Sequence, residues 1–301
     1  MQMIGFYLFL ALEKFLMLLP RSWRKAFFIA LGTFAYKISK RYGRVVEQNL
    51  KFVYGNDVDP EFVDKVKRYS FKQMLLNFLH TMESRYYSPE EIVEKITFEN
   101  LEVVQKVQQE KRPIIFVTGH YGSWELAGRA LSFSVEPILI IYKKMKNKYF
   151  ENYLLSSREK WKMTYAERHG ATKAMLKTLR SGGAMAILID TNVNKKEAIQ
   201  VKFLGHQVSQ IQTTAYFARK FNAALIPALI HTEDDEHFTI KFDEEIIPPK
   251  TEDEKEDLKI STQMQTDWLS AEIMKEPEPW FWLHRRFKED HPEIYARTPE
   301  S

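Results

Sequence analysis

The chain of 301 residues begins with two apolar runs, residues 4–20 and residues 27–38. Apolar positions recur at helical spacing between residues 62 and 79. The sequence Ser88-Pro89-Glu90-Glu91 is typical of a helix start with a capping box. These patterns predict that the first hundred residues are mainly helical.

Strand and helix patterns alternate from residue 113 onward. The predicted strands are residues 113–119, 137–142, 184–190, 224–230 and 237–247, and the predicted helices are residues 124–132, 149–165, 172–180 and 212–221. Continuous apolar strands between helices indicate a largely parallel sheet covered on both faces. We therefore expect an α/β domain over residues 46–301, with a largely parallel central sheet flanked by helices.

Residues 1–45 raise the question of a membrane anchor. The first apolar run is interrupted only by Glu13 and Lys14, and between residues 21 and 51 eight Lys or Arg residues stand against one acid, Glu47. Apolar segments followed by a basic patch are typical of an anchor that lies against anionic headgroups. A buried core helix is the alternative interpretation. The pattern does not distinguish a single span from a helix that lies in the membrane plane.

Composition narrows the chemistry. The chain contains no cysteine, which excludes disulfides, thiolate metal sites and a cysteine acyl-enzyme. The net charge is only +4, and acids gather at residues 233–236 and 252–257. We therefore do not expect a nucleic-acid-binding protein.

A histidine stands at the corner between a predicted strand and a predicted helix. His120 follows the apolar strand, and Glu125 comes five residues later. Positions five apart in one helix lie about 140° apart, so the two side chains can face each other only if His120 precedes the helix. Ser123 is a good N-cap, which would leave Glu125 in the first turn. A carboxylate that orients a neutral imidazole suits general-base attack by a hydroxyl, although a purely structural role for the pair remains open.

Other chemistries fit these residues less well. The sequence around Ser123 lacks the Gly-x-Ser-x-Gly pattern of hydrolases, because positions 121 and 125 are Tyr and Glu. Ser123 is therefore interpreted as a cap rather than as a nucleophile. A lone His and Glu do not make a metal site, so neither a metal nor a cofactor is expected.

The corner resembles a known family. His120-Tyr121-Gly122-Ser123-Trp124-Glu125 is similar to the His-x4-acid motif of glycerolipid acyltransferases, in the glutamate form of the late acyltransferases of bacterial lipid A biosynthesis. Further similarities follow in the family's order: Asn49-Leu50, Tyr142-Lys143-Lys144, Asn147, Arg158, Ile189-Asp190, Phe203-Leu204-Gly205, Ile226-Pro227 and Trp282–Lys288. The segment 191–195 departs from the pattern, because it lacks the second acid and the glycine often found there.

The resemblance implies an acyltransferase-like fold and a reaction. A fatty acyl chain would pass from acyl carrier protein to a hydroxyl of a lipid A precursor, at the cytoplasmic face of the inner membrane. His120 would be the base and Glu125 its orienting partner, and the amides near residues 122–124 are plausible oxyanion donors. Arg158, Asp190, Asn147 and Ser123 would contact substrate, with Arg158 recognising an anionic group.

Several alternatives stay open. Arg158 also fits an exposed salt bridge, and Asp190 fits a cap. Trp280 and Trp282 alternate with bases in the tail, which suits a membrane interface or an acidic partner, but both also fit the core. Acylation of another lysolipid or glycolipid is a competing function. A catalytically silent, membrane-bound lipid-binding protein is a further one.

Overall fold

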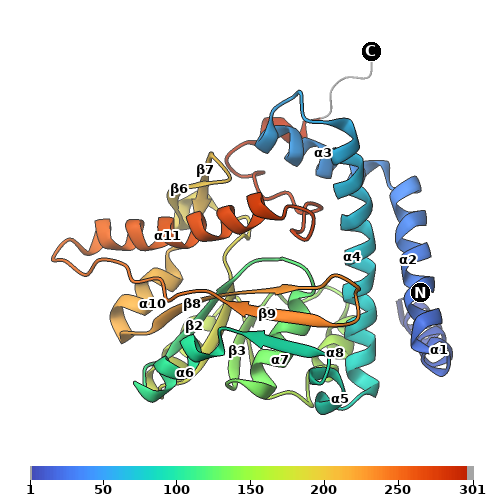
Figure 1. Cartoon of the computed structure of the whole chain (residues 1–301), viewed down its shortest axis with the longest axis horizontal. Helices are drawn as coiled ribbons and strands as arrows, with labels where there is room; N and C mark the ends of the chain where they lie inside the picture. Colours follow the sequence, from blue (N-terminus) through green and yellow to red (C-terminus); the bar gives the residue numbers. More distant parts are fainter. Residues whose placement is uncertain (1, 297–301) are drawn as a thin grey trace.

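The computed structural model describes residues 2–296. Within them, seven strands form one sheet in the order β1-β9-β8-β2-β5-β3-β4 (Figure 1). The strands are β1 (Ile96–Glu99), β2 (Ile114–Thr118), β3 (Ile138–Tyr142), β4 (Met163–Glu167), β5 (Ala184–Leu188), β8 (Ala224–His231) and β9 (Phe238–Phe242). Neighbours run parallel except β8 and β9, which pair antiparallel. The predicted α/β class with a mostly parallel central sheet is confirmed.

Both faces of the sheet are covered, as the apolar strands predicted. On β2, Ile114 and Phe116 belong to one buried cluster, while Ile115 and Val117 belong to another. Helices α6 (Leu101–Gln109) and α7 (Trp124–Ser134) supply the first cluster. Helices α9 (Ala171–Arg180), α10 (Thr213–Phe221) and α11 (Glu254–Lys275) contribute to the second. The carboxyl end of β2, where His120 stands, is therefore held between two packed layers.

The prediction of one helix over residues 149–165 is wrong. Helix α8 (Lys148–Ser156) is shorter, and β4 follows it and pairs with β3 in parallel register from Met163 to Glu167. Pairing with an open sheet edge decides the conformation of this segment, since every ladder hydrogen bond to β3 depends on tertiary contact.

A two-stranded sheet and one long helix were not predicted. Strands β6 (Ile199–Phe203) and β7 (His206–Gln210) form a hairpin whose two turn residues, Leu204 and Gly205, both have positive φ. This geometry matches the twist of the paired strands. The hairpin packs against α11. A short 3-10 helix, η1 (Lys195–Glu197), precedes the hairpin, and a second, η2 (Pro292–Tyr295), follows α11 near the C-terminus.

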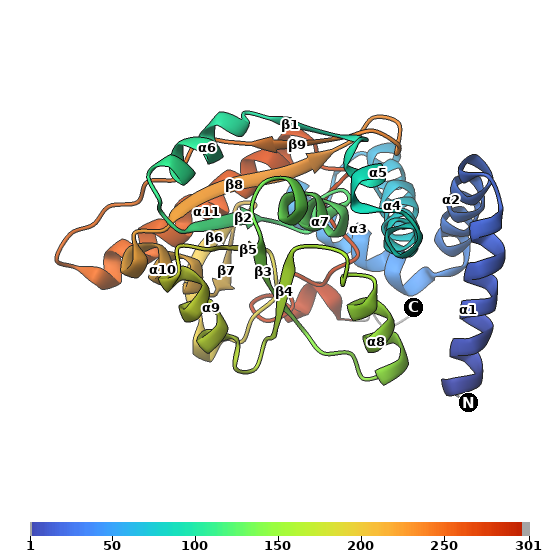
Figure 2. The ribbon, with the colours of Figure 1, turned by 90° about the horizontal axis from the view of Figure 1, so that it is seen from below.

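The N-terminal part is helical, as predicted. It comprises α1 (Gln2–Leu18), α2 (Arg21–Ile38), α3 (Lys40–Tyr54), α4 (Pro60–Tyr86) and α5 (Pro89–Val93). The capping box at Ser88 and Glu91 is present. Helix α4 stands beside the sheet, and α1 and α2 form the outermost layer against it (Figures 1 and 2). In the described part of the chain, no helix combines the length and apolar character needed to cross a bilayer.

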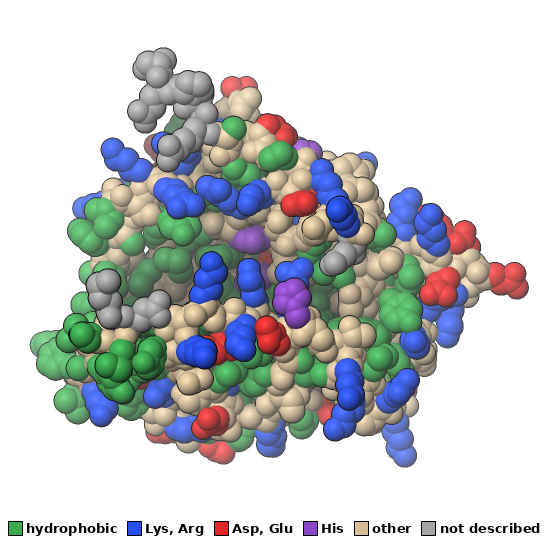
Figure 3. All heavy atoms as spheres, turned by 180° about the vertical axis from the view of Figure 1, so that it is seen from behind, with side chains coloured by type: hydrophobic (Ala, Val, Ile, Leu, Met, Phe, Trp, Pro, Cys, Tyr) green, Lys and Arg blue, Asp and Glu red, His purple; other side chains and the backbone are tan. Residues whose placement is uncertain are grey.

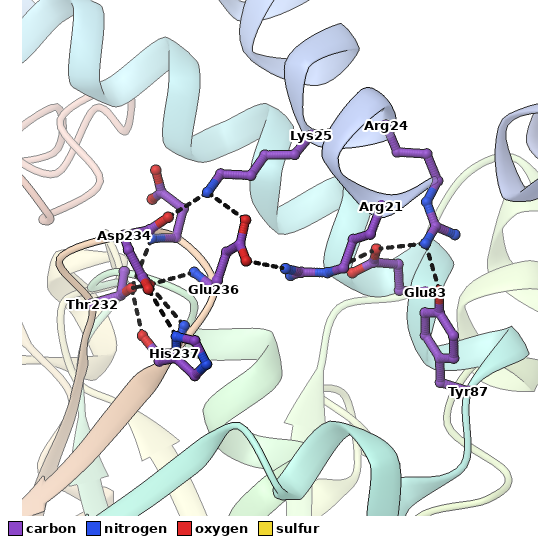
Figure 4. A network of polar contacts seen from close by, with 10 residues as sticks. Arg21, Arg24, Lys25, Glu83, Tyr87, Thr232, Asp234, Glu236 and His237 are labelled. Carbon is purple, nitrogen blue, oxygen red and sulfur yellow. Dashed lines mark hydrogen bonds and ion pairs between the residues drawn. The ribbon is translucent and has the colours of Figure 1, made fainter. Parts of the chain in front are cut away.

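Ion pairs hold α2 to the rest of the molecule (Figure 4). Arg21 and Lys25 contact Glu236 in the β8–β9 loop, at 3.7 Å and 3.0 Å, and Arg24 lies 3.6 Å from Glu83 of α4. Arg24 is almost fully buried. These basic residues, part of the patch noted in the sequence, therefore face the protein.

Candidate active site

His120 lies in the loop between β2 and α7, as the sequence predicted. Gly122 makes the turn possible: its φ is +55°, and a Cβ there would lie 2.6 Å from the carbonyl oxygen of Ile230. Any side chain at this position would be both strained and obstructed. Helix α7 begins at Trp124, with Ser123 at the N-cap position, although the Ser123 side chain makes no capping hydrogen bond.

Asp190 is the carboxylate that holds the His120 ring. The Nδ1 of His120 lies 2.8 Å from Oδ1 of Asp190, and the backbone N–H of His120 donates to Oδ2 at 2.7 Å. The indole N–H of Trp280 donates to the same Oδ2 at 2.8 Å. Because β2 and β5 are neighbours, the residues that follow them meet at one sheet edge. Sequence analysis expected Glu125 in this role, and the structure instead gives the Nδ1 contact to Asp190.

Glu125 makes a different contact. Both of its carboxylate oxygens accept hydrogen bonds from Nη2 of Arg158, at 2.9 Å and 3.0 Å. Nη1 of Arg129 lies 3.6 Å from Oε2 of Glu125. Arg158 is only 4% exposed and stacks over the ring of Tyr165 at 4.7 Å. An exposed surface salt bridge, the alternative considered for Arg158, does not describe this arrangement.

The two carboxylates set the charge of the imidazole. Burial lowers the pKa of His120, but the charge and hydrogen bond of Asp190 and the charge of Glu125 outweigh it, so this pKa lies above its usual value. Burial raises the pKa of Asp190, but the charge and hydrogen bonds of His120 and the hydrogen bond of Trp280 lower this pKa by more. The carboxylate therefore stays ionised. An ionised Asp190 keeps the proton on Nδ1, which leaves Nε2 of neutral His120 with a free lone pair.

The C-terminal segment after α11 forms one wall of the site. The N–H of Phe281 donates to the carbonyl of His120 at 2.9 Å, and the N–H of Gly122 donates to the carbonyl of Pro279 at 2.9 Å. The His120 ring packs edge-on to Trp124 at 5.3 Å and near Phe281 at 6.1 Å. Trp280 and Trp282 are fully buried, which agrees with the core alternative for these two tryptophans.

The remaining predicted residues, Ser123 and Asn147, make other contacts. The buried hydroxyl of Ser123 accepts from Gln73 at 3.0 Å and lies 3.2 Å from Nδ1 of His80, both on α4. Asn147 is the N-cap of α8 and accepts from the N–H of Tyr149 at 3.0 Å. Neither side chain forms a hydrogen bond with His120 or Glu125 among the residues that the structure describes.

The segment after Asp190, whose role the sequence left open, docks on the C-terminal wall. The N–H of Asn192 donates to Nε2 of His284 at 3.3 Å, and Oδ1 of Asn192 accepts from the N–H of Glu289 at 3.1 Å. Burial lowers the pKa of His284 to about 4, so this ring accepts as a neutral imidazole. Asn49 ties α3 to the same wall by donating to the carbonyls of Trp282 and His284, at 2.8 Å and 2.9 Å.

Trp280 was not predicted from the sequence as a residue of the site. Its indole fixes the second oxygen of Asp190, and only the approach of the C-terminal segment to the sheet edge reveals this contact. The available signal was a tryptophan in the tail motif, which was equally compatible with packing. Over residues 2–296, no group of three or more His, Asp or Glu side chains is arranged to hold a metal ion.

Comparison with known proteins decides the family. The model of the family described as bacterial lipid A biosynthesis acyltransferase matches residues 1–289. The chain belongs to this family. As a member, it is an acyltransferase, and the resemblance noted at the His120 corner is confirmed.

Curated relatives share the length of the chain at low identity. The lipid A biosynthesis lauroyltransferase of Escherichia coli K12 is 23% identical over 263 residues, covering 86% of this chain and 83% of the relative. The palmitoleoyltransferase of the same organism is 21% identical, covering 86% and 82%. A lipid A biosynthesis acyltransferase of Haemophilus influenzae is 22% identical, covering 86% and 83%. The family match, over residues 1–289, includes both the N-terminal helices and the α/β domain of this acyltransferase.

Proposed function

We propose that this acyltransferase transfers a fatty acyl chain from acyl carrier protein to a hydroxyl of a lipid A precursor, with His120 as the general base. The observation that carries this proposal is the contact of His120 Nδ1 with an ionised, buried Asp190. It fixes the tautomer and raises the basicity of Nε2. The names of the family and of its relatives support lipid A as the acceptor class.

The reaction needs only groups of this site and the two substrates. Nε2 of His120 takes the proton of the acceptor hydroxyl while its oxygen attacks the thioester carbon. The tetrahedral intermediate collapses to the ester and expels the carrier thiolate, which takes the proton back from the imidazolium. The chain has no cysteine and the Ser123 hydroxyl is buried against α4, so direct attack is simpler than a covalent acyl-enzyme.

The first turn of α7 supplies oxyanion donors in this proposal. The backbone N–H groups of Trp124 and Glu125 have no hydrogen-bond acceptor within residues 2–296. Helix N-termini carry partial positive charge and unpaired N–H groups, which favour a developing oxyanion. The loop that carries His120 leads directly into this helix start through the turn at Gly122.

Glu125 and Arg158 act in this proposal as a positioning pair. Nη2 of Arg158 contacts Glu125. The Nε and Nη1 atoms of Arg158 are buried and lack a hydrogen-bond partner in the described chain. A guanidinium so enclosed suits orientation of the Glu125 carboxylate better than direct contact with a substrate phosphate. The negative charge of Glu125 in turn stabilises the imidazolium that forms during attack.

We further propose that residues 1–45 attach the protein to the cytoplasmic face of the inner membrane, with residues 46–301 as the catalytic domain. The outward side of α1 is almost wholly apolar, and its exposed large side chains are Met3, Ile4, Tyr7, Leu8, Leu12, Phe15 and Leu18. On α2, Trp23, Phe27, Leu31, Phe34 and Ile38 continue this surface. Such faces suit helices that lie in the membrane plane.

The face opposite to that of Figure 1 supports this orientation. Figure 3 shows a hollow there, with Lys and Arg side chains on both sides of it and hydrophobic side chains gathered at the edge formed by α1 and α2. A basic rim suits both anionic headgroups and an acidic carrier protein. A lipid acceptor could then enter from the membrane while the carrier approaches from the cytosol.

Purified protein tests the reaction directly. Acyl carrier protein loaded with a fatty acid is incubated with a lipid A precursor, and the product is identified by mass spectrometry. Acylated precursor formed by wild type and lost in His120→Ala supports the proposal. Turnover of the thioester with a different glycolipid or lysolipid only, or no turnover at all, would contradict it.

A further inference from the structure

A polar pocket lies where α2 ends and α3 begins, and its lining does not include His120. It has a volume of about 470 Å³, and its lining includes Lys37, Lys40, Arg44 and Lys67. These residues come from the last turn of α2, from the first half of α3 and from α4. The proposed acyl transfer uses none of them.

The pocket carries an excess of positive charge. Glu47 is the acid of its lining, and the Glu47 carboxylate already contacts Lys51 at 2.8 Å and Lys67 at 3.4 Å. Lys37, Lys40 and Arg44 are exposed, and none of them has an acidic partner within residues 2–296. Three uncompensated cations around one cavity favour an anionic ligand.

The start of α3 adds backbone donors to this cavity. Ser39, at the N-cap, also lines the pocket, and its side chain makes no hydrogen bond to the helix. The first backbone bond of this 15-residue helix runs from the N–H of Gly43 to the carbonyl of Ser39, and the N–H groups of residues 40–42 have no acceptor within residues 2–296. Free N–H groups at a helix start are a common feature of phosphate sites, and here they coincide with a basic cavity.

The surroundings indicate which anion fits. Phe34 and Ile38 of α2 and Tyr42 of α3 are large, exposed side chains within a few residues of the pocket. They continue the apolar surface of α1 and α2 as far as the cavity. A ligand with an anionic phosphate and apolar chains meets both surfaces, whereas a free phosphate meets only one.

We propose that the pocket at the α2–α3 junction binds the phosphate of an anionic phospholipid headgroup and so orients the protein on the membrane. This inference rests on the proposed membrane contact of α1 and α2, but not on the proposed reaction. Each Lys or Arg near an anionic surface contributes about a fivefold gain in membrane affinity. Two pocket cations should therefore account for about a twenty-five-fold preference.

Vesicle flotation of the full-length protein, without any acyl donor, tests this site. Wild type should prefer vesicles of phosphatidylcholine mixed with phosphatidylglycerol over vesicles of phosphatidylcholine alone. Lys40→Ala/Arg44→Ala should lose most of that preference. Lys106→Ala/Lys255→Ala removes two exposed lysines of α6 and α11 as a matched control and should keep it. An equal loss in both pairs would mean diffuse attraction and would overturn the pocket.

A variant that fills the cavity without altering its charge tests whether the shape of the cavity matters as well as its charged side chains. Gly43 lines the pocket, and a Cβ there would make ordinary contact with Lys67 at 3.5 Å. Gly43→Leu should lower the preference for phosphatidylglycerol vesicles, and Gly43→Ala should change it little. Thermal unfolding shows whether Gly43→Leu is folded. If it is folded and retains the wild-type preference, the cavity is not the site.

Soluble phosphate identifies the source of the ligand. Inorganic phosphate is titrated into detergent-solubilised wild type and into Lys40→Ala/Arg44→Ala. Weak binding that the double variant loses, together with the vesicle preference, supports a lipid headgroup. Phosphate binding at the pocket without any preference for phosphatidylglycerol vesicles would overturn the lipid assignment. Failure of wild type to bind either kind of vesicle would overturn the membrane contact itself, whatever the outcome of the acyl transfer assay.

Discussion

The loop around His120 and the layer of α1 and α2 both bury charged groups, but only the second presents an apolar surface to its surroundings. Around His120, Asp190 is enclosed against the imidazole of His120, and Arg158 is enclosed against the carboxylate of Glu125. In the outer layer, the charged groups of Glu13 and Arg24 are also buried, but the exposed side chains of α1 and α2 are mostly large and apolar. A hydrophobic surface of this kind is unusual for a face in contact with water alone.

Exposure shows the size of the difference. On α1, Leu8 is 67% exposed and Leu18 is 84% exposed, while Glu13 is only 1% exposed and lies 3.4 Å from Arg85. A helix that buries its acid and exposes large apolar side chains fits the proposed attachment to a membrane. In the proposed function, one chain combines a catalytic domain with an edge that contacts lipid, as a lipid acceptor requires.

The largest expected effect is at the base. His120→Ala should lower acyl transfer by about 10² to 10⁴-fold, because general-base assistance is worth that much. Thermal unfolding should change little, since the His120 side chain is 26% exposed. If Glu125 acts with His120, the variant His120→Ala/Glu125→Ala should be little slower than His120→Ala. Wild-type turnover in His120→Ala would remove the proposed mechanism.

The next effect concerns the acid that holds the base. Asp190→Asn should lower transfer by up to about 10⁴-fold, because the amide no longer favours the reactive tautomer. In wild type the rate should fall as pH drops through the raised pKa of His120, which protonates the base. Asparagine removes the charge that raises this pKa, so the acidic limb of kcat/KM should move to lower pH.

Trp280→Phe provides a comparison for this pH profile. It removes one hydrogen bond to Asp190 but leaves the carboxylate charge. The acidic limb should therefore stay close to that of wild type. An unchanged limb in Asp190→Asn would mean that Asp190 does not control the ionisation of His120.

The outer layer should respond in membrane binding rather than in chemistry. Leu8→Glu/Phe15→Glu places two carboxylates on the apolar face of α1, where burying each large side chain in lipid is worth about 1.5 to 3 kcal/mol. Vesicle binding should fall by at least about a hundredfold. Ile247→Glu, at an exposed position outside this layer, should leave binding unchanged. Equal losses in both variants would contradict a specific membrane face.

Strands β2, β3, β5 and β8 of the central sheet could be predicted because each is a short, continuous apolar run, and β9 from its partial alternation, whereas the half-polar β1 was missed. Helix α11 could not be predicted, because its buried side includes Asp257, Ser261, Thr262, Gln265 and Thr266. Apolar periodicity does not detect a helix that buries polar groups. Strand β4 was missed for a related reason: its residues become a strand only by pairing with β3.

The site shows the same limit. His120 was found from its position after an apolar strand, and Arg158 from resemblance alone. The contact between His120 and Asp190 joins residues seventy positions apart, and it exists because β2 and β5 are adjacent. Nothing in local spacing indicates that adjacency, whereas Glu125 was close enough in sequence to suggest itself as the partner.

A smaller loss of activity is expected at Arg158. Lysine keeps the charge, but its ammonium lacks the planar guanidinium that stacks on Tyr165 and so fixes the donor toward Glu125. Arg158→Lys should lower kcat by about tenfold, with little change in KM for either substrate if the residue positions Glu125. Because Arg158 is buried, the melting temperature should also fall. A rise in KM for the lipid acceptor alone would instead indicate direct contact with that substrate.

The smallest effect is expected at Asn147, which distinguishes a cap from a substrate contact. Its side chain accepts from the N–H of Tyr149 at the start of α8, and loss of such a cap costs about 0.5 to 2 kcal/mol. Asn147→Ala should lower stability by about that amount, and Asn147→Asp, which can still cap, should restore it. Both variants should transfer acyl groups at the wild-type rate if the residue only caps α8. The family resemblance implies a substrate contact, and in that case both variants would raise KM although only alanine destabilises the protein. Measuring KM and thermal unfolding on wild type and both variants therefore separates a role as helix cap from a contact with substrate.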